Sequence, residues 1–223
     1  MKINKVTIQT SKLNETRHFY NHVLGFQLIT SNENQFAIQI GNSLLEFLET
    51  KKETNPFYHF AFNIPSNQFQ EAKYWAQLKV TLTVEDEMDE VYFKFLDAHS
   101  FYFIDPSGNI VEFISRHSVS VQSNDAFSVN SILNISEINV TTTDVMSVGK
   151  QLMANGIGVR DGNELTESLN FMGKEGCFLL LGPQNRRWIF SNKRSKCFPV
   201  VITIDQKKLI EVDEFGKVDI KHL

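Results

Sequence analysis

The feature that most constrains the fold is an internal repeat in the first half of the chain. The runs 41–48 (GNSLLEFL) and 108–114 (GNIVEFI) each place a Gly-Asn turn before an apolar strand that carries one glutamate, Glu46 or Glu112. A repeated unit cannot bury its apolar face alone and packs against its copies. The repeat therefore predicts similar supersecondary units that share one core.

Each copy reads as a βαβββ module. Residues 5–9 and 59–63 alternate in the period-2 pattern of an opening strand. Apolar side chains then recur at helical spacing over 15–24, where Gly25 ends the helix, and over 68–78. Three further strands are predicted after each helix, at 26–30, 36–40 and 44–48 in the first module and at 79–84, at 91–96 together with 100–104, and at 109–114 in the second.

The remaining sequence holds a third, incomplete copy. Residues 138–142 read as a strand, 145–155 as a helix and 176–181 as a closing strand in which leucine replaces glutamate. The polar stretch 117–130 has the composition of a linker. We therefore expect an α+β protein with a two-module domain over 1–120, from modules of about 1–52 and 56–116, followed by a degenerate half domain with a C-terminal tail over 121–223.

The composition argues against two classes of partner. The net charge is -4 and the pI is about 5.9, whereas nucleic acids and anionic membranes bind concentrated basic surfaces. No apolar stretch approaches the roughly 20 residues of a membrane span. We expect a cytoplasmic protein that binds a small molecule. The basic segment 186–196, which surrounds Trp188, is predicted to be a solvated loop, with a phosphate or acidic partner as the alternative.

The two repeated glutamates stand among apolar neighbours. Strand alternation places Glu46 and Glu112 each on a face shared with leucine or isoleucine. Burying an unpaired carboxylate costs several kcal/mol, so each glutamate needs a cation, hydrogen bonds or access to solvent. The same alternation groups Lys5 with Thr7 and Gln9 on the first opening strand. A metal ion or a lysine would satisfy the carboxylates.

Two longer motifs give the chain a family resemblance over residues 1–116. The segment 17–26, RHFYNHVLGF, is similar to a helix ending of the vicinal oxygen chelate superfamily, the group of glyoxalases, bleomycin-resistance proteins and extradiol dioxygenases. The segment 102–109, YFIDPSGN, followed by Glu112, resembles the closing hairpin of that superfamily. The resemblance implies that paired βαβββ modules curl into a cup-shaped mixed sheet.

The resemblance also implies a metal site built from the opening and closing strands. Its four ligand positions fall on Lys5, Glu46, His59 and Glu112. Imidazole and carboxylate groups ligate divalent ions, so the resemblance implies that His59, Glu46 and Glu112 hold Fe, Mn, Ni or Zn. Lys5 departs from the pattern, because a protonated ammonium has no lone pair to offer a metal.

Three functions follow from the resemblance. The first is a metal-dependent lyase or isomerase of glyoxalase type, acting on a small substrate that chelates through adjacent oxygens. Its expected catalytic residues are Glu46, Glu112 and Tyr102, and its expected substrate contacts are Lys5, Thr7, Gln9 and Tyr102.

The second function is a metal-free binding protein of bleomycin-resistance type, in which Lys5 neutralises the two glutamates. The third is an extradiol dioxygenase. The resemblance implies that such an enzyme binds its metal through two histidines and one glutamate, and of these three ligands the chain offers only His59 and Glu112. A homodimer in which paired chains share their cups stays open as an alternative to a monomer.

Overall fold

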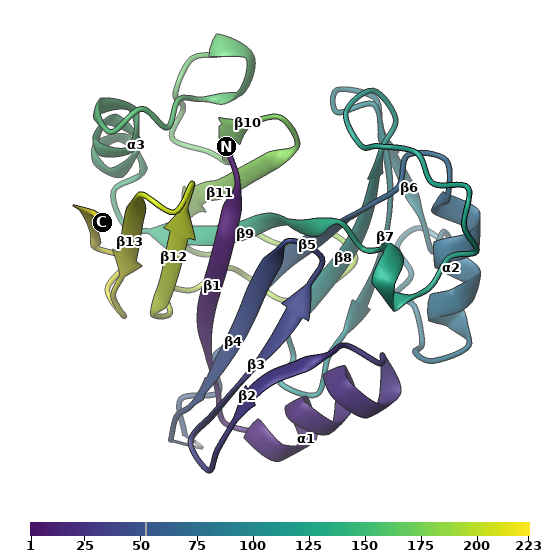
Figure 1. Cartoon of the computed structure of the whole chain (residues 1–223). Coiled ribbons are helices and arrows are strands. Elements are labelled where there is room, and N and C mark those ends of the chain that lie inside the picture. The colour runs from purple at the N-terminus through teal and green to yellow at the C-terminus, as the bar shows by residue number, and fades with distance from the viewer. Residues whose placement is uncertain (52) are drawn as a thin grey trace.

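The structure, a computed structural model, describes residues 1–51 and 53–223 and confirms the predicted α+β class (Figure 1). The first module consists of β1 (Ile3–Thr10), α1 (Leu13–His18), a π-helical turn (Phe19–Val23), β2 (Leu28–Ser31), β3 (Gln35–Ile40) and β4 (Ser43–Glu49). The second consists of β5 (His59–Ile64), α2 (Phe69–Gln77), β6 (Val91–Phe93), β7 (Ala98–Ile104) and β8 (Ile110–Arg116). Both modules thus have the βαβββ order.

The rest of the chain adds strands to these two modules. Its first part repeats the module order as β9 (Asn134–Thr142), α3 (Val145–Ala154), β10 (Asn170–Lys174) and β11 (Cys177–Pro183). The second strand of this copy is reduced to a single bridge between Val159 and Met172. The C-terminal part is an antiparallel meander without a helix, formed by β12 (Val200–Ile204), β13 (Lys208–Val212) and β14 (Val218–His222).

Two predicted elements differ from the structure. The first helix begins at Leu13 and continues from Phe19 as a π-helical turn. The strand expected at 79–84 is a loop that makes one bridge, between Leu82 and Phe103. β6 pairs with Ala98–Ser100 of β7, so this segment reaches only the remaining part of that edge, where it contacts Tyr102 and Phe103.

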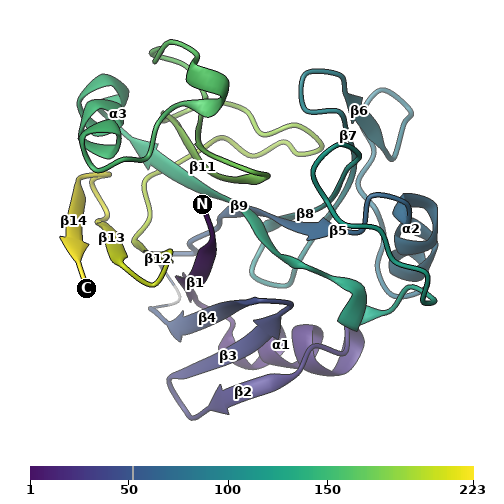
Figure 2. The same cartoon turned by 45° about the horizontal axis from the view of Figure 1, so that its top comes forward.

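The modules pair in an order that differs from the expected one. One seven-stranded sheet runs β14-β13-β12-β1-β4-β3-β2, and the other runs β10-β11-β9-β5-β8-β7-β6 (Figure 2). β1 therefore pairs with β12 of the C-terminal meander, and β5 pairs with β9 of the third copy. The division expected near residue 120 does not separate the sheets, because modules 1–52 and 56–116 belong to different sheets and residues 121–223 extend both of them.

The edges of the opening strands explain this arrangement. In the first two modules the closing strand pairs in parallel with one edge of the opening strand, β4 with β1 and β8 with β5. The other edge needs an antiparallel partner, because buried backbone N–H and C=O groups must be paired. The period-2 patterns of 5–9 and 59–63 suit pairing with the adjacent module or with a distant one equally well, so they do not identify the partner.

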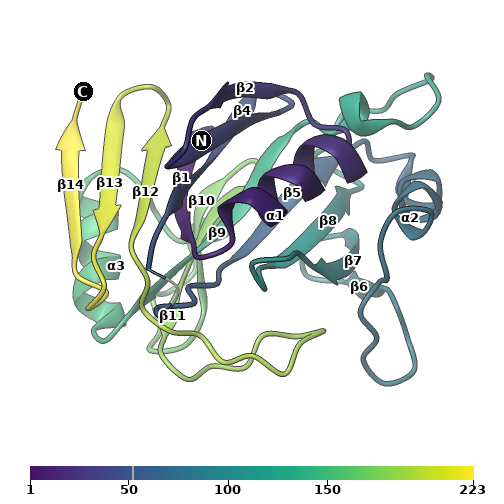
Figure 3. The same ribbon diagram turned by 90° about the horizontal axis from the view of Figure 1, so that it is seen from below.

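The two sheets share one apolar core. Val6 and Phe47 of the first sheet and Phe60 and Phe113 of the second are fully buried in it. The helices α2 and α3 lie at opposite ends of the molecule (Figure 3). Because alternate side chains of β5 point to opposite faces, His59 lies on the face of the second sheet that is turned away from this core.

The helices are short. The longest of those described, α3, has 10 residues. No helix within residues 1–51 and 53–223 has the length and apolar composition to cross a bilayer.

Replacing Gly41 with alanine tests the close contact between the two sheets. Gly41 has a φ of +51°, and a Cβ placed there would lie 2.1 Å from the carbonyl oxygen of Leu133. We expect Gly41→Ala to lower the free energy of unfolding by about 2 to 4 kcal/mol, because it adds both backbone strain and a clash with backbone. Gly158→Ala is the matched control, since a Cβ there meets nothing within 4 Å. Urea unfolding of both variants measures the difference, and equal stabilities would contradict the contact.

Candidate metal centre

The first two residues of the centre come from adjacent strands of the second sheet. Phe60 and Phe62 of β5 point into the core, so His59 and Ala61 point to the opposite face. The parallel pairing of β5 with β8 places Glu112 beside Ala61. His59 Nε2 consequently lies 3.3 Å from Glu112 Oε2, and both side chains are buried.

A third acidic residue arrives from β9. The antiparallel pairing of β5 with β9 places Glu137 beside Ala61 on the edge opposite Glu112. One ligand atom each of His59, Glu112 and Glu137 lies within 4.8 Å of the other two. Within residues 1–51 and 53–223, this is the only group of three or more His, Cys, Asp or Glu side chains with metal-ligand spacing. One imidazole and two carboxylates suit a divalent transition metal.

The strand registers show how the repeat generates this set. Glu112 is paired with Ala61, two residues after His59. In the third copy Leu180 is paired with Asn139, two residues after Glu137. Glu137 is thus the counterpart of His59, and the leucine noted in the third closing strand is the counterpart of Glu112. Sequence reasoning missed Glu137, although it lies one residue before the strand expected at 138–142.

The imidazole of His59 is fixed by its second nitrogen. Its Nδ1 lies 3.1 Å from the backbone oxygen of Ile110. In the tautomer that carries the hydrogen on Nδ1, the ring donates to this oxygen and turns the lone pair of Nε2 toward Glu112. A backbone acceptor on the far nitrogen is the usual support of a metal-binding histidine.

A buried arginine holds Glu137. Arg116 is 1% exposed and donates from Nη2 to a carboxylate oxygen of Glu137 and, at 3.1 Å, to Ser136 Oγ. Its Cζ lies 5.2 Å from the ring centroid of Phe178. The pKa of Glu137 is raised to about 7, because burial and the nearby charge of Glu112 outweigh the lowering by Arg116 and His59. Glu137 is therefore the carboxyl group of this centre that changes protonation near neutral pH.

A cavity of about 220 Å³ adjoins the three residues. Tyr102 of β7 lines it beside Glu112, its pairing partner on β8. Burial, followed by the charges of Glu112 and Glu137, raises the pKa of the Tyr102 hydroxyl well above its ordinary value. Tyr102 thus remains a neutral phenol that can donate a hydrogen bond. The other lining residues are mainly apolar: Phe93, Phe95, Leu96, Leu169, Phe171, Leu180, Trp188 and Ile189, with Arg186 as the cation.

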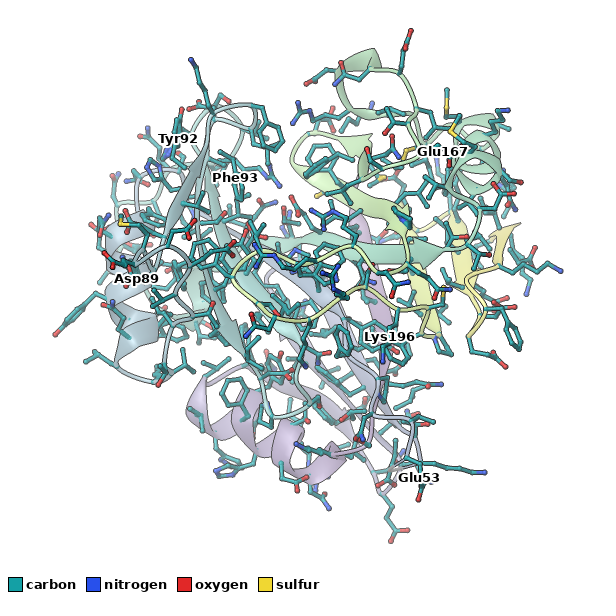
Figure 4. The ribbon with its side chains drawn as sticks, turned by 180° about the vertical axis from the view of Figure 1, so that it is seen from behind. Glu53, Asp89, Tyr92, Phe93, Glu167 and Lys196 are labelled. Atoms are coloured by element: carbon teal, nitrogen blue, oxygen red, sulfur yellow. The ribbon has the colours of Figure 1, made fainter. Side chains whose placement is uncertain are left out.

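The loop between β11 and β12 lines one side of this cavity and buries Trp188 and Phe190, so the prediction of a solvated loop at 186–196 is wrong for these two residues. Figure 4 shows it in front of the strands of the second sheet. The ring of Trp188 lies 4.7 Å from that of His59, and Phe190 stacks on Tyr102 at 4.8 Å, between centroids. Glu85 fastens the loop, because it accepts from the backbone N–H of Phe190 and pairs with Arg187.

Comparison with known proteins identifies the family. The model of the Glyoxalase/Bleomycin resistance protein/Dioxygenase superfamily matches residues 2–113, half of the chain. The chain belongs to this superfamily. A second family model, that of the toxoflavin-degrading enzyme, matches residues 135–186. No curated protein matches the sequence.

Solved structures resemble this chain at low sequence identity. A candidate dioxygenase from Bacillus subtilis subsp. subtilis str. 168 is 12% identical, with a TM-score of 0.60 over 100% of this chain and 84% of that chain. A lactoylglutathione lyase from Agrobacterium tumefaciens is 18% identical, with a TM-score of 0.41 over 50% of this chain and 91% of that chain. The first likeness includes the C-terminal strands that the superfamily model leaves unmatched.

The ligand set that the superfamily resemblance implied is only partly brought together. Glu46 lies in the other sheet, where its Oε2 is 2.8 Å from Lys5 Nζ and accepts a hydrogen bond from Thr7 Oγ1 at 2.9 Å. Its charge is thus neutralised by Lys5. The expected convergence of Lys5 and Glu46 with His59 and Glu112 is wrong, because β1 pairs with β12 and not with β5.

Of the other residues predicted from the sequence, some lie at the centre and some lie in the other sheet. Thr7 and Gln9 lie with Lys5 on β1, in the sheet that does not contain the centre. Tyr102 lies at the centre, as expected. A further histidine of the same strand, His99, points to the opposite face of β7, where its ring lies 5.1 Å from that of Phe69 and its Nδ1 is 2.7 Å from His117 Nε2.

Replacing Glu137 with glutamine should change how stability depends on pH. A pKa of about 7 in the folded protein lies above the value of about 4.3 for an unfolded glutamate. The folded state therefore binds this proton more tightly, so its contribution to stability is present at low pH and is lost as pH rises. We expect the free energy of unfolding of the wild type, relative to Glu137→Gln, to fall between about pH 4.5 and 7 and then level off. Urea unfolding across this range is the measurement, and parallel curves would contradict the raised pKa.

Proposed function

We propose that the chain is a metal-dependent lyase or isomerase of glyoxalase type that acts on a small substrate with adjacent oxygens. The observation that carries the proposal is the convergence of His59, Glu112 and Glu137 within 4.8 Å at the wall of a largely apolar cavity. Buried carboxylates of this kind need a cation. Arg116 supplies one to Glu137, whereas Glu112 has His59 as its neighbour and is the residue that a metal would serve most.

The donor set fits a divalent transition ion such as Mn, Fe, Ni or Zn. His59 would contribute Nε2, and Glu112 and Glu137 one carboxylate oxygen each. Leu180, at the fourth equivalent position, contributes no ligand and leaves room for substrate oxygens. When bound, the ion would act as a Lewis acid toward two adjacent oxygens of the substrate.

The residues of the chain would position the substrate and exclude water. Tyr102, as a neutral phenol, would donate a hydrogen bond to a substrate oxygen. Glu137, with a pKa of about 7, would hold or release a proton in the ion-free protein at neutral pH. Trp188 and Phe190 would keep bulk water away from these groups, which strengthens every electrostatic interaction inside the cavity.

The two other functions have less support. An extradiol dioxygenase of this superfamily needs two histidines and one glutamate, and the centre offers one histidine with two glutamates. A metal-free binding protein in which Lys5 replaces the ion suits Glu46 alone, since Lys5 does not reach the second sheet. The match to the toxoflavin-degrading enzyme over 135–186 includes Glu137 and Leu180, and supports a role in breaking down a small molecule.

Titration with Mn²⁺ tests the proposed ligands. We expect the chelator-treated wild type to bind one ion, and Glu112→Gln or Glu137→Gln to weaken binding at least about 100-fold, because each removes a charged ligand. Glu46→Gln is the matched control: it removes the glutamate of the equivalent closing strand and should leave Mn²⁺ affinity unchanged. Isothermal titration calorimetry measures all four proteins. Loss of binding in Glu46→Gln, or no binding by the wild type, would overturn the proposal.

A further inference from the structure

Arg186 is a cation that the proposed metal chemistry does not use. It lines the cavity together with His59, Glu112 and Glu137, from the loop between β11 and β12. Its Nη1 is buried and has no hydrogen-bond partner among residues 1–51 and 53–223. A buried guanidinium N–H without an acceptor is costly. A group that enters the cavity can supply that acceptor.

The cavity also has a fixed balance of charge. The carboxylates of Glu112 and Glu137 are offset by two guanidinium groups, that of Arg116 behind Glu137 and that of Arg186 on the cavity wall. A divalent ion bound between the carboxylates would therefore leave its own charge uncompensated by the protein. A ligand that brings negative charge restores the balance, and beside largely apolar walls this attraction is stronger than in bulk water.

The walls of the cavity suit a flat ring. Trp188, Phe93, Phe95 and Phe171 line it, and Phe95 makes edge contacts with Phe93 and with Phe171 at centroid distances of 5.8 Å. Figure 4 labels Phe93 on the side of the molecule that the β11–β12 loop covers. The Cζ atom of Arg186 lies 4.8 Å from the ring centroid of Trp188, so a ring bound against Trp188 would have this guanidinium beside it.

We propose that this site takes a flat aromatic anion, whose charged oxygens accept hydrogen bonds from Arg186 while its ring packs against Trp188. The proposal rests on the proposed function, since it names the substrate class of the same centre. Arg186 is then a specificity-determining residue. A planar guanidinium offers two parallel N–H donors, which match the two oxygens of a carboxylate or an equivalent delocalised anion.

Two probes that differ in charge test this assignment: 2-naphthoate and its uncharged amide, 2-naphthamide. With Mn²⁺ present, we expect the wild type to bind 2-naphthoate at least about tenfold more tightly than 2-naphthamide. Arg186→Gln should reduce this preference to below about twofold, mainly by weakening binding of the anion. Arg186→Lys keeps a charge without the forked donor geometry and should show an intermediate preference. Calorimetric titration gives both affinities for each protein.

Lys196→Gln is the matched control, because Lys196 is an exposed cation on the same loop outside the cavity lining (Figure 4). It should keep the full preference for 2-naphthoate. Equal affinities of the wild type for the two probes, no saturable binding of 2-naphthoate, or an unchanged preference in both Arg186 variants would each overturn the assignment. Circular dichroism of the variants separates loss of fold from loss of binding, and Arg186→Lys decides the matter should Arg186→Gln unfold.

The same titrations without Mn²⁺ separate this assignment from the proposed function. A wild type that does not bind Mn²⁺ but prefers 2-naphthoate through Arg186 would remove the metal chemistry and leave the anion site. A wild type that binds Mn²⁺ but shows no preference dependent on Arg186 would leave the proposed metal chemistry in place and remove the anion site.

Discussion

The antiparallel pairing of β5 with β9 is the contact on which the rest of the structure depends. It joins the second module to the third copy, and it places Glu137 across Ala61 from Glu112. Without it, His59 and Glu112 would be two residues on the edge of a half sheet. With it, three donors from three strands meet on one face, and the loop that follows β11 has a surface to cover.

The centre concentrates charge in a region that would be more stable without it. Arg116, Glu112 and Glu137 are each at most 3% exposed, and burying such groups costs free energy that their mutual attraction only partly returns. Arg116 limits this cost through hydrogen bonds to Glu137, Ser136 and Asn63. Glu46 is in the opposite situation, since Lys5 and Thr7 satisfy it without a ligand. The two sheets therefore have related strands, but Glu46 of the first sheet is already paired, whereas the carboxylates of the centre in the second sheet still need a cation.

The local structure could be predicted from the sequence, and the pairing of modules could not. Strand alternation and the repeated Gly-Asn turns predicted the βαβββ order, because this depends on neighbouring residues, and the superfamily resemblance implied His59, Glu112 and Tyr102 as site residues. The partners of β1 and β5 lie far along the chain at β12 and β9, and nothing in the period-2 pattern selects between near and distant copies. The error about Glu46 and the omission of Glu137 both follow from that single undetermined choice. Trp188 was assigned to solvent because its basic neighbours dominate the local composition.

Leu180 has a consequence for the orientation of a bound molecule. Two modules related by a twofold axis form a cup in which a small molecule has two equivalent orientations. Leu180 occupies the position that corresponds to Glu112, so one corner of this cup is hydrocarbon and the other is a carboxylate. A ligand then meets hydrocarbon at one end of the site and a carboxylate at the other. Leu180 thus makes the two ends of the cup inequivalent, so that the two orientations of a bound molecule differ in energy.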